Sequence, residues 1–93
     1  MSPSPPRHTE VPLQQWLTTH LAVYLDRLPE SIEATVPLAE YGMDSVCALS
    51  LCGDIEDDFG IVVEPSLAWD HPTVAQLAAY LVTRGADLER GKR

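Results

Sequence analysis

The sequence has few basic residues and no long run of apolar residues. Its 93 residues include 14 acidic and only 6 basic side chains, so the formal net charge is −8. A surface of this sign repels nucleic-acid phosphates and anionic membranes, and it favours basic patches on other proteins. No apolar stretch approaches the roughly 20 residues of a membrane span, and residues 1–6 lack the apolar segment of a signal peptide. We therefore expect a cytoplasmic protein, monomeric, that binds neither nucleic acid nor membranes.

Cysteine and histidine are also scarce. Cys47 and Cys52 are five residues apart, so in a helix they point about 140° away from each other and cannot pair. The 3 histidines are scattered, and no spacing matches a zinc site. The acidic segment 54–60 fails the calcium-loop pattern, because Phe59 and Pro65 stand where that loop needs Gly and Glu. We predict no metal site, and one buried and one surface thiol.

Hydrophobic residues make up 45% of the chain, which is enough for the core of one small domain. Residues 1–8 contain three prolines and are expected to form a disordered lead-in. Residues 9–84 carry the apolar patterns and are predicted to form the domain. The polar residues 85–93 are predicted to be a flexible tail.

Apolar residues recur every three or four positions in three segments, which is typical of amphipathic helices. Asp44 and Thr73 are expected to cap the second and third of these helices. Pro29 is expected to end the first helix, and Gly60 the second. A short helical turn is predicted over residues 65–69. The longer helices are predicted to span approximately residues 10–28, 45–59 and 74–84. The fold class is therefore all-α, a four-helix bundle of three longer helices and one short third helix.

The apolar face of each helix predicts the core. Leu51 falls off the apolar stripe of the second helix and is expected to be exposed. The loop 30–43 is long for a compact domain, which indicates function at one of its ends. The residues expected on the three stripes are Leu13, Trp16, Leu17, Leu21, Tyr24, Leu25 and Leu28; Val46, Leu49, Cys52, Ile55 and Phe59; and Val74, Leu77, Ala78 and Leu81.

The start of the second helix carries the main motif. Residues 41–46 read Tyr-Gly-Met-Asp-Ser-Val and resemble the attachment motif of acyl carrier proteins, Gly-x-Asp-Ser-Leu, with Val46 in place of Leu. Residues 38–41 resemble the approach loop of polyketide-synthase carriers. Residues 69–73, Trp-Asp-His-Pro-Thr, resemble the element before their last helix. The resemblance covers approximately residues 11–82.

This resemblance implies a carrier domain of the acyl carrier protein family, of the polyketide-synthase type, which is not itself an enzyme. Ser45 would receive 4′-phosphopantetheine from coenzyme A through a phosphopantetheinyl transferase and magnesium. The thiol of this arm would hold acyl or polyketide intermediates as thioesters. An acyltransferase or acyl-activating ligase would load them, and a ketosynthase and other biosynthetic enzymes would use them.

The residues themselves suit such a group. A serine in the first helical turn lies beside backbone N–H groups that lack helical acceptors. The helix dipole there favours negative charge by roughly 0.3–1 kcal/mol, and Asp44 is expected to fix where the helix begins. Ser45 lacks the Gly-x-Ser-x-Gly context of a catalytic serine, and no residue is assigned as its base. We expect His20 and His71 to be structural.

The resemblance also implies that the second helix is the surface that partner enzymes recognise. Its predicted contacts are Val46, Cys47, Leu51, Asp54, Glu56, Asp57 and Asp58. Two alternatives remain open at this point: a peptidyl carrier of nonribosomal synthesis, and a helical interaction module that carries no arm. Asp44 before the serine and the strong acidity favour an acyl carrier over a peptidyl carrier.

Overall fold

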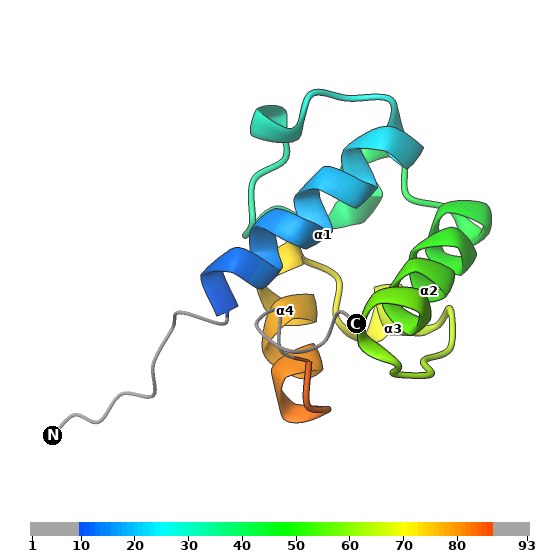
Figure 1. The fold of residues 1–93 in the computed structure, drawn as a ribbon. Coiled ribbons are helices and arrows are strands. Elements are labelled where there is room, and N and C mark those ends of the chain that lie inside the picture. The colour runs from blue at the N-terminus through cyan, green and yellow to red at the C-terminus, as the bar shows by residue number, and fades with distance from the viewer. Residues whose placement is uncertain (1–9, 87–93) are drawn as a thin grey trace, which may run out of the picture.

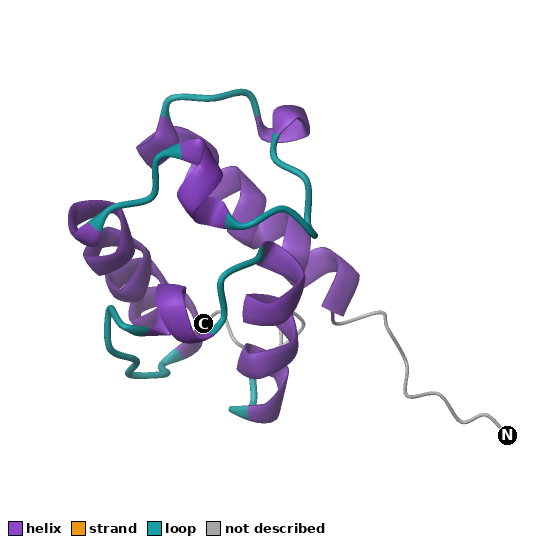
Figure 2. Cartoon of the chain, turned by 180° about the vertical axis from the view of Figure 1, so that it is seen from behind, coloured by secondary structure: helices purple, strands orange, loops and turns teal. Residues whose placement is uncertain are grey.

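The computed structural model of the chain describes residues 10–86, and within this range its regular structure is entirely helical. Figure 1 shows the path of the chain, and Figure 2 shows helices joined by loops. The elements are α1 (Glu10–Leu25), η1 (Pro29–Ser31), η2 (Leu38–Tyr41), α2 (Ser45–Phe59), α3 (Leu67–Asp70) and α4 (Val74–Thr83), where η marks a 3₁₀ helix. The predicted bundle of three longer helices and a short third one is confirmed. The predicted lead-in 1–8 and the tail from residue 87 onward lie outside the described residues.

The core forms where α1 packs against both α2 and α4 (Figure 1). Leu13, Leu17 and Leu21 of α1 are fully buried, as their helical spacing predicts. All four residues predicted on the α4 stripe are buried as well. Burying a side chain such as leucine contributes about 1.5–3 kcal/mol, so these helix faces dominate the stability of the domain.

Helix α1 ends earlier than predicted. It stops at Leu25, and Asp26 adopts a left-handed conformation with φ 58°. The N–H of Arg27 then donates to the carbonyl of Ala22 at 3.0 Å, which is the closing bond of a Schellman motif. The prediction that Pro29 ends this helix is wrong: Pro29 begins η1, and Leu28 is exposed.

The loop between α1 and α2 is fixed to the start of α4. The N–H of Leu38 donates to the carbonyl of Pro72 at 2.8 Å, and the N–H of Ala75 donates to the carbonyl of Ala34 at 2.9 Å. Ile32 and Leu38 of this loop are buried in the core. These contacts hold the long loop in one place, so it leads into α2 from a defined direction.

The segment after α2 has no regular structure over residues 60–64. Thr73 caps α4 in a capping box with Gln76, which confirms the predicted start of that helix. Gly85 takes φ 96°, and Ala86 is buried in the core with its N–H donated to Leu81 at 2.9 Å. The first two residues of the predicted flexible tail therefore belong to the folded domain.

Candidate functional site

The start of α2 is fixed by Asp44. Its backbone is extended, and its carboxylate accepts a hydrogen bond from the N–H of Cys47 at 2.9 Å. The carbonyl of Asp44 accepts the N–H of Ala48, also at 2.9 Å. The bond from Cys47 lowers the pKa of Asp44 below its ordinary value, because it stabilises the carboxylate. Asp44 is thus the predicted N-cap, and it is charged at neutral pH.

Ser45 is the first residue of α2, and it is exposed. Its hydroxyl lies at the end of the helix where the first backbone N–H groups have no helical acceptor. Gly42 ends η2 in the left-handed region with φ 94°, which lets the loop turn into Asp44. An exposed hydroxyl beside a helix N-terminus suits a phosphodiester, because the helix dipole favours its negative charge.

The two predicted faces of α2 are partly exchanged in the structure. Leu49, expected in the core, is 62% exposed, and Val46, expected both on the apolar stripe and among the partner contacts, is 72% exposed. Cys47 and Leu51, expected to contact partners, are buried, and Leu51 has no exposed surface. These two predictions of partner contacts are wrong. The reason is that α2 carries apolar residues on both faces, and the face that meets α1 is the one that includes Leu51.

Both cysteines are buried, so the prediction of one surface thiol is also wrong. The Sγ of Cys47 donates to the carbonyl of Tyr24 across the contact between α1 and α2, at 3.6 Å. Burial raises the pKa of both thiols, because the thiolate loses its hydration. Neither thiol is therefore a reactive nucleophile at neutral pH.

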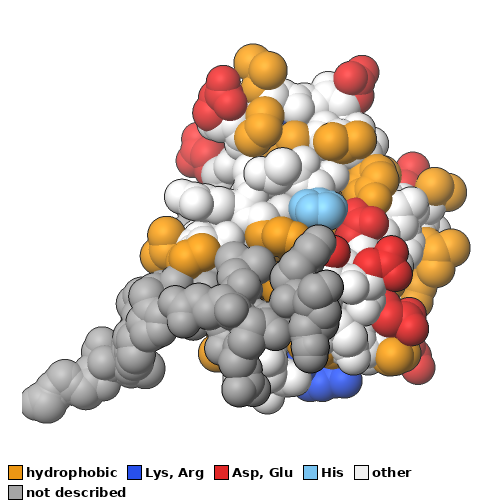
Figure 3. All heavy atoms as spheres, viewed as in Figure 1, with side chains coloured by type: hydrophobic (Ala, Val, Ile, Leu, Met, Phe, Trp, Pro, Cys, Tyr) orange, Lys and Arg blue, Asp and Glu red, His pale blue; other side chains and the backbone are white. Residues whose placement is uncertain are grey.

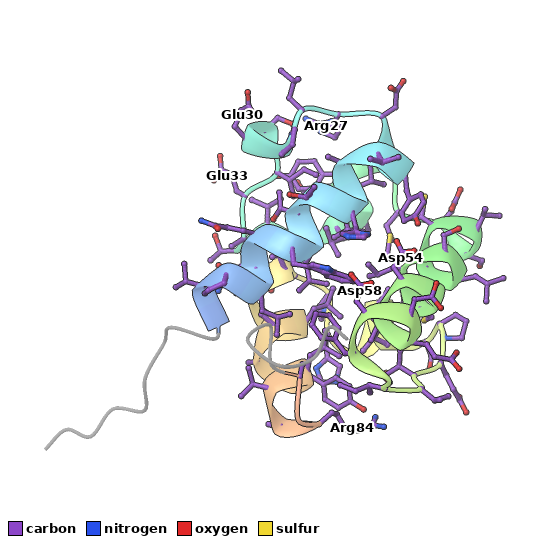
Figure 4. All side chains as sticks on the ribbon, viewed as in Figure 1. Arg27, Glu30, Glu33, Asp54, Asp58 and Arg84 are labelled. Atoms are coloured by element: carbon purple, nitrogen blue, oxygen red, sulfur yellow. The ribbon has the colours of Figure 1, made fainter. Side chains whose placement is uncertain are left out.

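The acidic residues of α2 divide into two groups. Glu56 and Asp57 are exposed, whereas the carboxylates of Asp54 and Asp58 are turned toward α1 (Figure 4). The predicted partner contacts at Asp54 and Asp58 thus belong to residues that bond within the domain. Figure 3 shows acidic and hydrophobic side chains close together over the outer side of α2.

We call the contact of Trp16, His20 and Tyr24 with Asp54 and Asp58 the α1–α2 seam. One oxygen of Asp54 lies 2.8 Å from His20 Nδ1 and accepts the Tyr24 hydroxyl at 2.5 Å. Trp16 Nε1 donates to Asp58 at 2.8 Å, and the Trp16 ring stacks on His20 with centroids 4.0 Å apart. The hydrogen bond to Asp54 raises the pKa of Tyr24 to about 12.

Sequence reasoning missed the α1–α2 seam, although a pattern was present. The three α1 residues follow at steps of four, and so do the two aspartates of α2, which places each set on one helix face. His20 is held in this seam, and His71 stacks on Tyr80 with ring centroids 4.3 Å apart. Both positions fit the predicted structural role. Within residues 10–86, no group of three or more Cys, His, Asp or Glu is placed to hold a metal ion.

No helix of the described part of the chain is long and apolar enough to cross a membrane.

Comparison with known proteins places these features in a family. The model of the family described as "Phosphopantetheine attachment site" matches residues 15–81. Among curated proteins, the chain is 35% identical over 72 residues to a phenolphthiocerol/phthiocerol polyketide synthase of Mycobacterium tuberculosis, a match that covers 77% of this chain and 4% of that synthase. It is 40% identical over 75 residues to the spectinabilin polyketide synthase system protein NorC of Streptomyces orinoci, covering 78% of this chain and 3% of that protein.

Solved structures agree. A free-standing peptidyl carrier protein from Acinetobacter baumannii has 37% identity and a TM-score of 0.79, with 82% of this chain and 95% of that chain covered. The acyl carrier protein Asl1650 from Anabaena sp. PCC 7120 has 31% identity and a TM-score of 0.69, covering 87% of this chain and 92% of that chain. The family match extends over most of the chain and includes the start of α2. The chain therefore belongs to the phosphopantetheine-attachment family, and it is a carrier domain with the fold of acyl and peptidyl carrier proteins.

Proposed function

We propose that Ser45 is the residue that bears 4′-phosphopantetheine, and that the domain carries acyl or polyketide intermediates on it. The observation that supports this most directly is the exposed Ser45 hydroxyl at the first position of α2, next to the capping residue Asp44. The thiol of the arm would hold the cargo as a thioester.

In the loading reaction, the Oγ of Ser45 forms a bond to the phosphorus next to the pantetheine of coenzyme A. The pyrophosphate bond breaks, adenosine 3′,5′-bisphosphate leaves, and the hydroxyl proton is lost. The domain supplies the nucleophilic oxygen. The base and the magnesium belong to the transferase, since His20 and His71 are held in contacts elsewhere. The new phosphodiester lies at the positive end of the α2 dipole. In this proposal the domain is a substrate and carrier, and not an enzyme.

The pathway is proposed from the relatives. The curated relatives are named as polyketide synthases, so we propose that an acyltransferase or acyl-activating ligase loads the arm and that a ketosynthase uses it. Attachment of the arm requires coenzyme A, and its acylation requires that the thiol of the arm stay reduced. Both conditions suit the cytoplasm. A peptidyl carrier is the second candidate, because a protein of that name has 37% identity to the chain. The family match argues against a helical module that carries no arm.

The test is an intact-mass measurement after incubation with coenzyme A, magnesium and a promiscuous phosphopantetheinyl transferase. We expect the wild-type protein to gain the mass of one phosphopantetheine, and Ser45→Ala to gain none. Ser50→Ala is the matched control, because it removes a second serine hydroxyl from α2, and it should load fully. An unmodified wild-type protein, or a modified Ser45→Ala variant, would contradict the assignment.

A further inference from the structure

The exposed side of α1 is uncharged, although the net charge of the chain is −8. From Val11 to Leu25, the helix contains no Asp, Glu, Lys or Arg. Its exposed positions follow at steps of four, and we call them the outer stripe of α1: Val11, Gln15, Thr19 and Val23. This stripe points away from the buried leucines of the same helix. In Figure 3, side chains without charge occupy the middle of the view, over α1, and acidic side chains lie around them.

The stability of the domain does not explain the residues of the outer stripe. Val23 is 75% exposed, so it contributes little to the core. β-branched residues such as valine and threonine also favour a helix less than lysine or glutamate does, because their χ1 angle is restricted. Leu28, in the loop after α1, is 66% exposed and borders the same shallow hollow as Val23. Together these side chains form an apolar patch that the isolated domain leaves in contact with water.

Two open hollows lie along the outer stripe, and Thr19 borders both of them. The hollow near the start of α1 has a volume of about 430 Å³, and its walls include Val11 and Ile32. The hollow near the end of the helix is bordered by the exposed side chains of Val23 and Leu28. One end of this face thus offers a recess with apolar walls, and the other end offers two protruding apolar side chains.

We infer that the outer stripe of α1 is a self-association surface, through which two copies of this chain pair around a two-fold axis with their α1 helices antiparallel. Val23 and Leu28 of each copy then enter the recess beside Val11 of the other copy. In the middle, Gln15 of each copy faces Thr19 of the other. A two-fold contact must be complementary to itself, and a face with a recess at one end and protruding side chains at the other meets this condition.

Charge supports a second copy as the occupant. Two chains of the same strongly negative charge repel each other, so they can approach closely only where neither presents charge, as along the outer stripe. Glu30 stands at the edge of the first hollow, and Asp26 and Arg27 stand at the edge of the second. The antiparallel arrangement turns the Arg27 end of one copy toward the Glu30 end of the other, so these edge charges are partly paired.

Self-association through α1 is separate from the proposed role of Ser45. Ser45 lies on α2, outside the outer stripe, so both copies of the pair keep the attachment residue exposed. The sequence alone predicts a monomer, and this face revises that expectation. Because the contact involves one helix and one loop from each copy, we expect weak association, with a dissociation constant on the order of 0.1–1 mM.

The test is sedimentation equilibrium of the full chain at concentrations from about 10 µM to about 1 mM. We expect the average mass to rise from that of one chain, 10.2 kDa, toward that of two. Val23→Glu should weaken the association at least tenfold, because it buries a carboxylate in the contact. Val62→Glu is the matched control, since Val62 is exposed after α2 and the variant gains the same charge. It should associate like the wild type.

Mixtures of variants test the antiparallel arrangement. Val23→Glu mixed with Val11→Lys should associate more tightly than Val23→Glu mixed with Val62→Lys. Both mixtures have the same net charges, but only the first places a glutamate of one copy against a lysine of the other. Added salt should strengthen the pairing of wild-type chains, because it screens their mutual repulsion.

Several outcomes would overturn the inference. One is a wild-type chain that stays monomeric over the whole concentration range, which would leave the groove to another protein. Equal weakening by Val23→Glu and Val62→Glu, with both variants folded by circular dichroism, is another. So is equal association in the two mixtures. Association that appears only after residues 1–9 are removed would mean that this segment covers the groove, and it would overturn the inference as well.

Discussion

The α1–α2 seam makes Asp54 an important residue for stability. Its carboxylate contacts both His20 and Tyr24, at 2.8 and 2.5 Å. Asp57, one turn further along the same helix, is exposed. Replacing each aspartate with alanine removes the same charge and gives a similar gain in helix propensity. The difference between the Asp54→Ala and Asp57→Ala variants therefore measures what the α1–α2 seam contributes through Asp54.

The expected difference follows from the geometry. A hydrogen bond to a charged group contributes about 1.5–3 kcal/mol when it is well shielded from water. The side chains of His20 and Asp54 are 31% and 24% exposed, so water replaces part of what the variant loses. We therefore expect Asp54→Ala to unfold with about 2 kcal/mol less free energy than Asp57→Ala. For a domain of this size, that corresponds to a melting temperature lower by about 10 °C.

Urea denaturation followed by circular dichroism measures both free energies of unfolding. Asp57→Ala should stay within about 0.5 kcal/mol of the wild type, as is usual for an exposed position. Equal stabilities of the two variants would refute the reasoning, because the bonds of Asp54 to α1 would then add nothing. If both variants lost the same free energy of unfolding, the cause would be the removal of a negative charge from α2 and not the bonds of Asp54.

Two further predictions concern α2 and its contact with α1. Leu51→Ala should lower the free energy of unfolding by about 2–5 kcal/mol, whereas Val46→Ala should change it by less than about 0.5 kcal/mol. Denaturation curves that show the reverse would mean that Val46, and not Leu51, lies on the buried face of α2. The pKa of Tyr24 is raised to about 12 in the folded protein, so its hydroxyl holds its proton more tightly in the folded state than in the unfolded chain. Its contribution to stability is therefore complete below about pH 10 and is lost as the pH rises toward 12. The free energy of unfolding of Tyr24→Phe should therefore fall less steeply with pH over this range than that of the wild type. Parallel pH dependences of the two proteins would contradict the raised pKa of Tyr24.

The sequence predicted helix ends best where a single side chain, or a single glycine, determines the conformation of the neighbouring backbone. Asp44 and Thr73 have side chains that accept N–H groups three residues ahead, and both helices begin where these residues predict. Gly60 likewise ends α2 in the left-handed region. The end of α1 was missed because Asp26 adopts that region without being glycine. Pro29 was the stronger stop pattern, but the Schellman bonds end the helix before the chain reaches it.

The buried face of α2 could not be derived from periodicity. Apolar residues occur on both sides of this helix, and a stripe through Val46 and Leu49 is as regular as one through Leu51 and Ile55. Contact with α1 decides between them, and this contact depends on residues distant in sequence. The α1 side presents Trp16, which donates to Asp58, so the aspartates of the seam turn inward with the Leu51 face.

Because Asp54 and Asp58 face α1, only some of the acidic residues of α2 are free to attract a basic partner enzyme. A partner surface that includes Asp54 and Asp58 would require carboxylates that already accept bonds from α1. Reversing the charge at Asp58 would place a basic group against Trp16 and disturb the packing of α1 on α2, so slower loading of such a variant would not identify a docking contact. Glu56 and Asp57 are exposed on the same helix. Charge reversal at these two residues changes the electrostatic attraction of a basic enzyme while the α1–α2 seam stays intact, and the resulting loss should shrink as salt screens it.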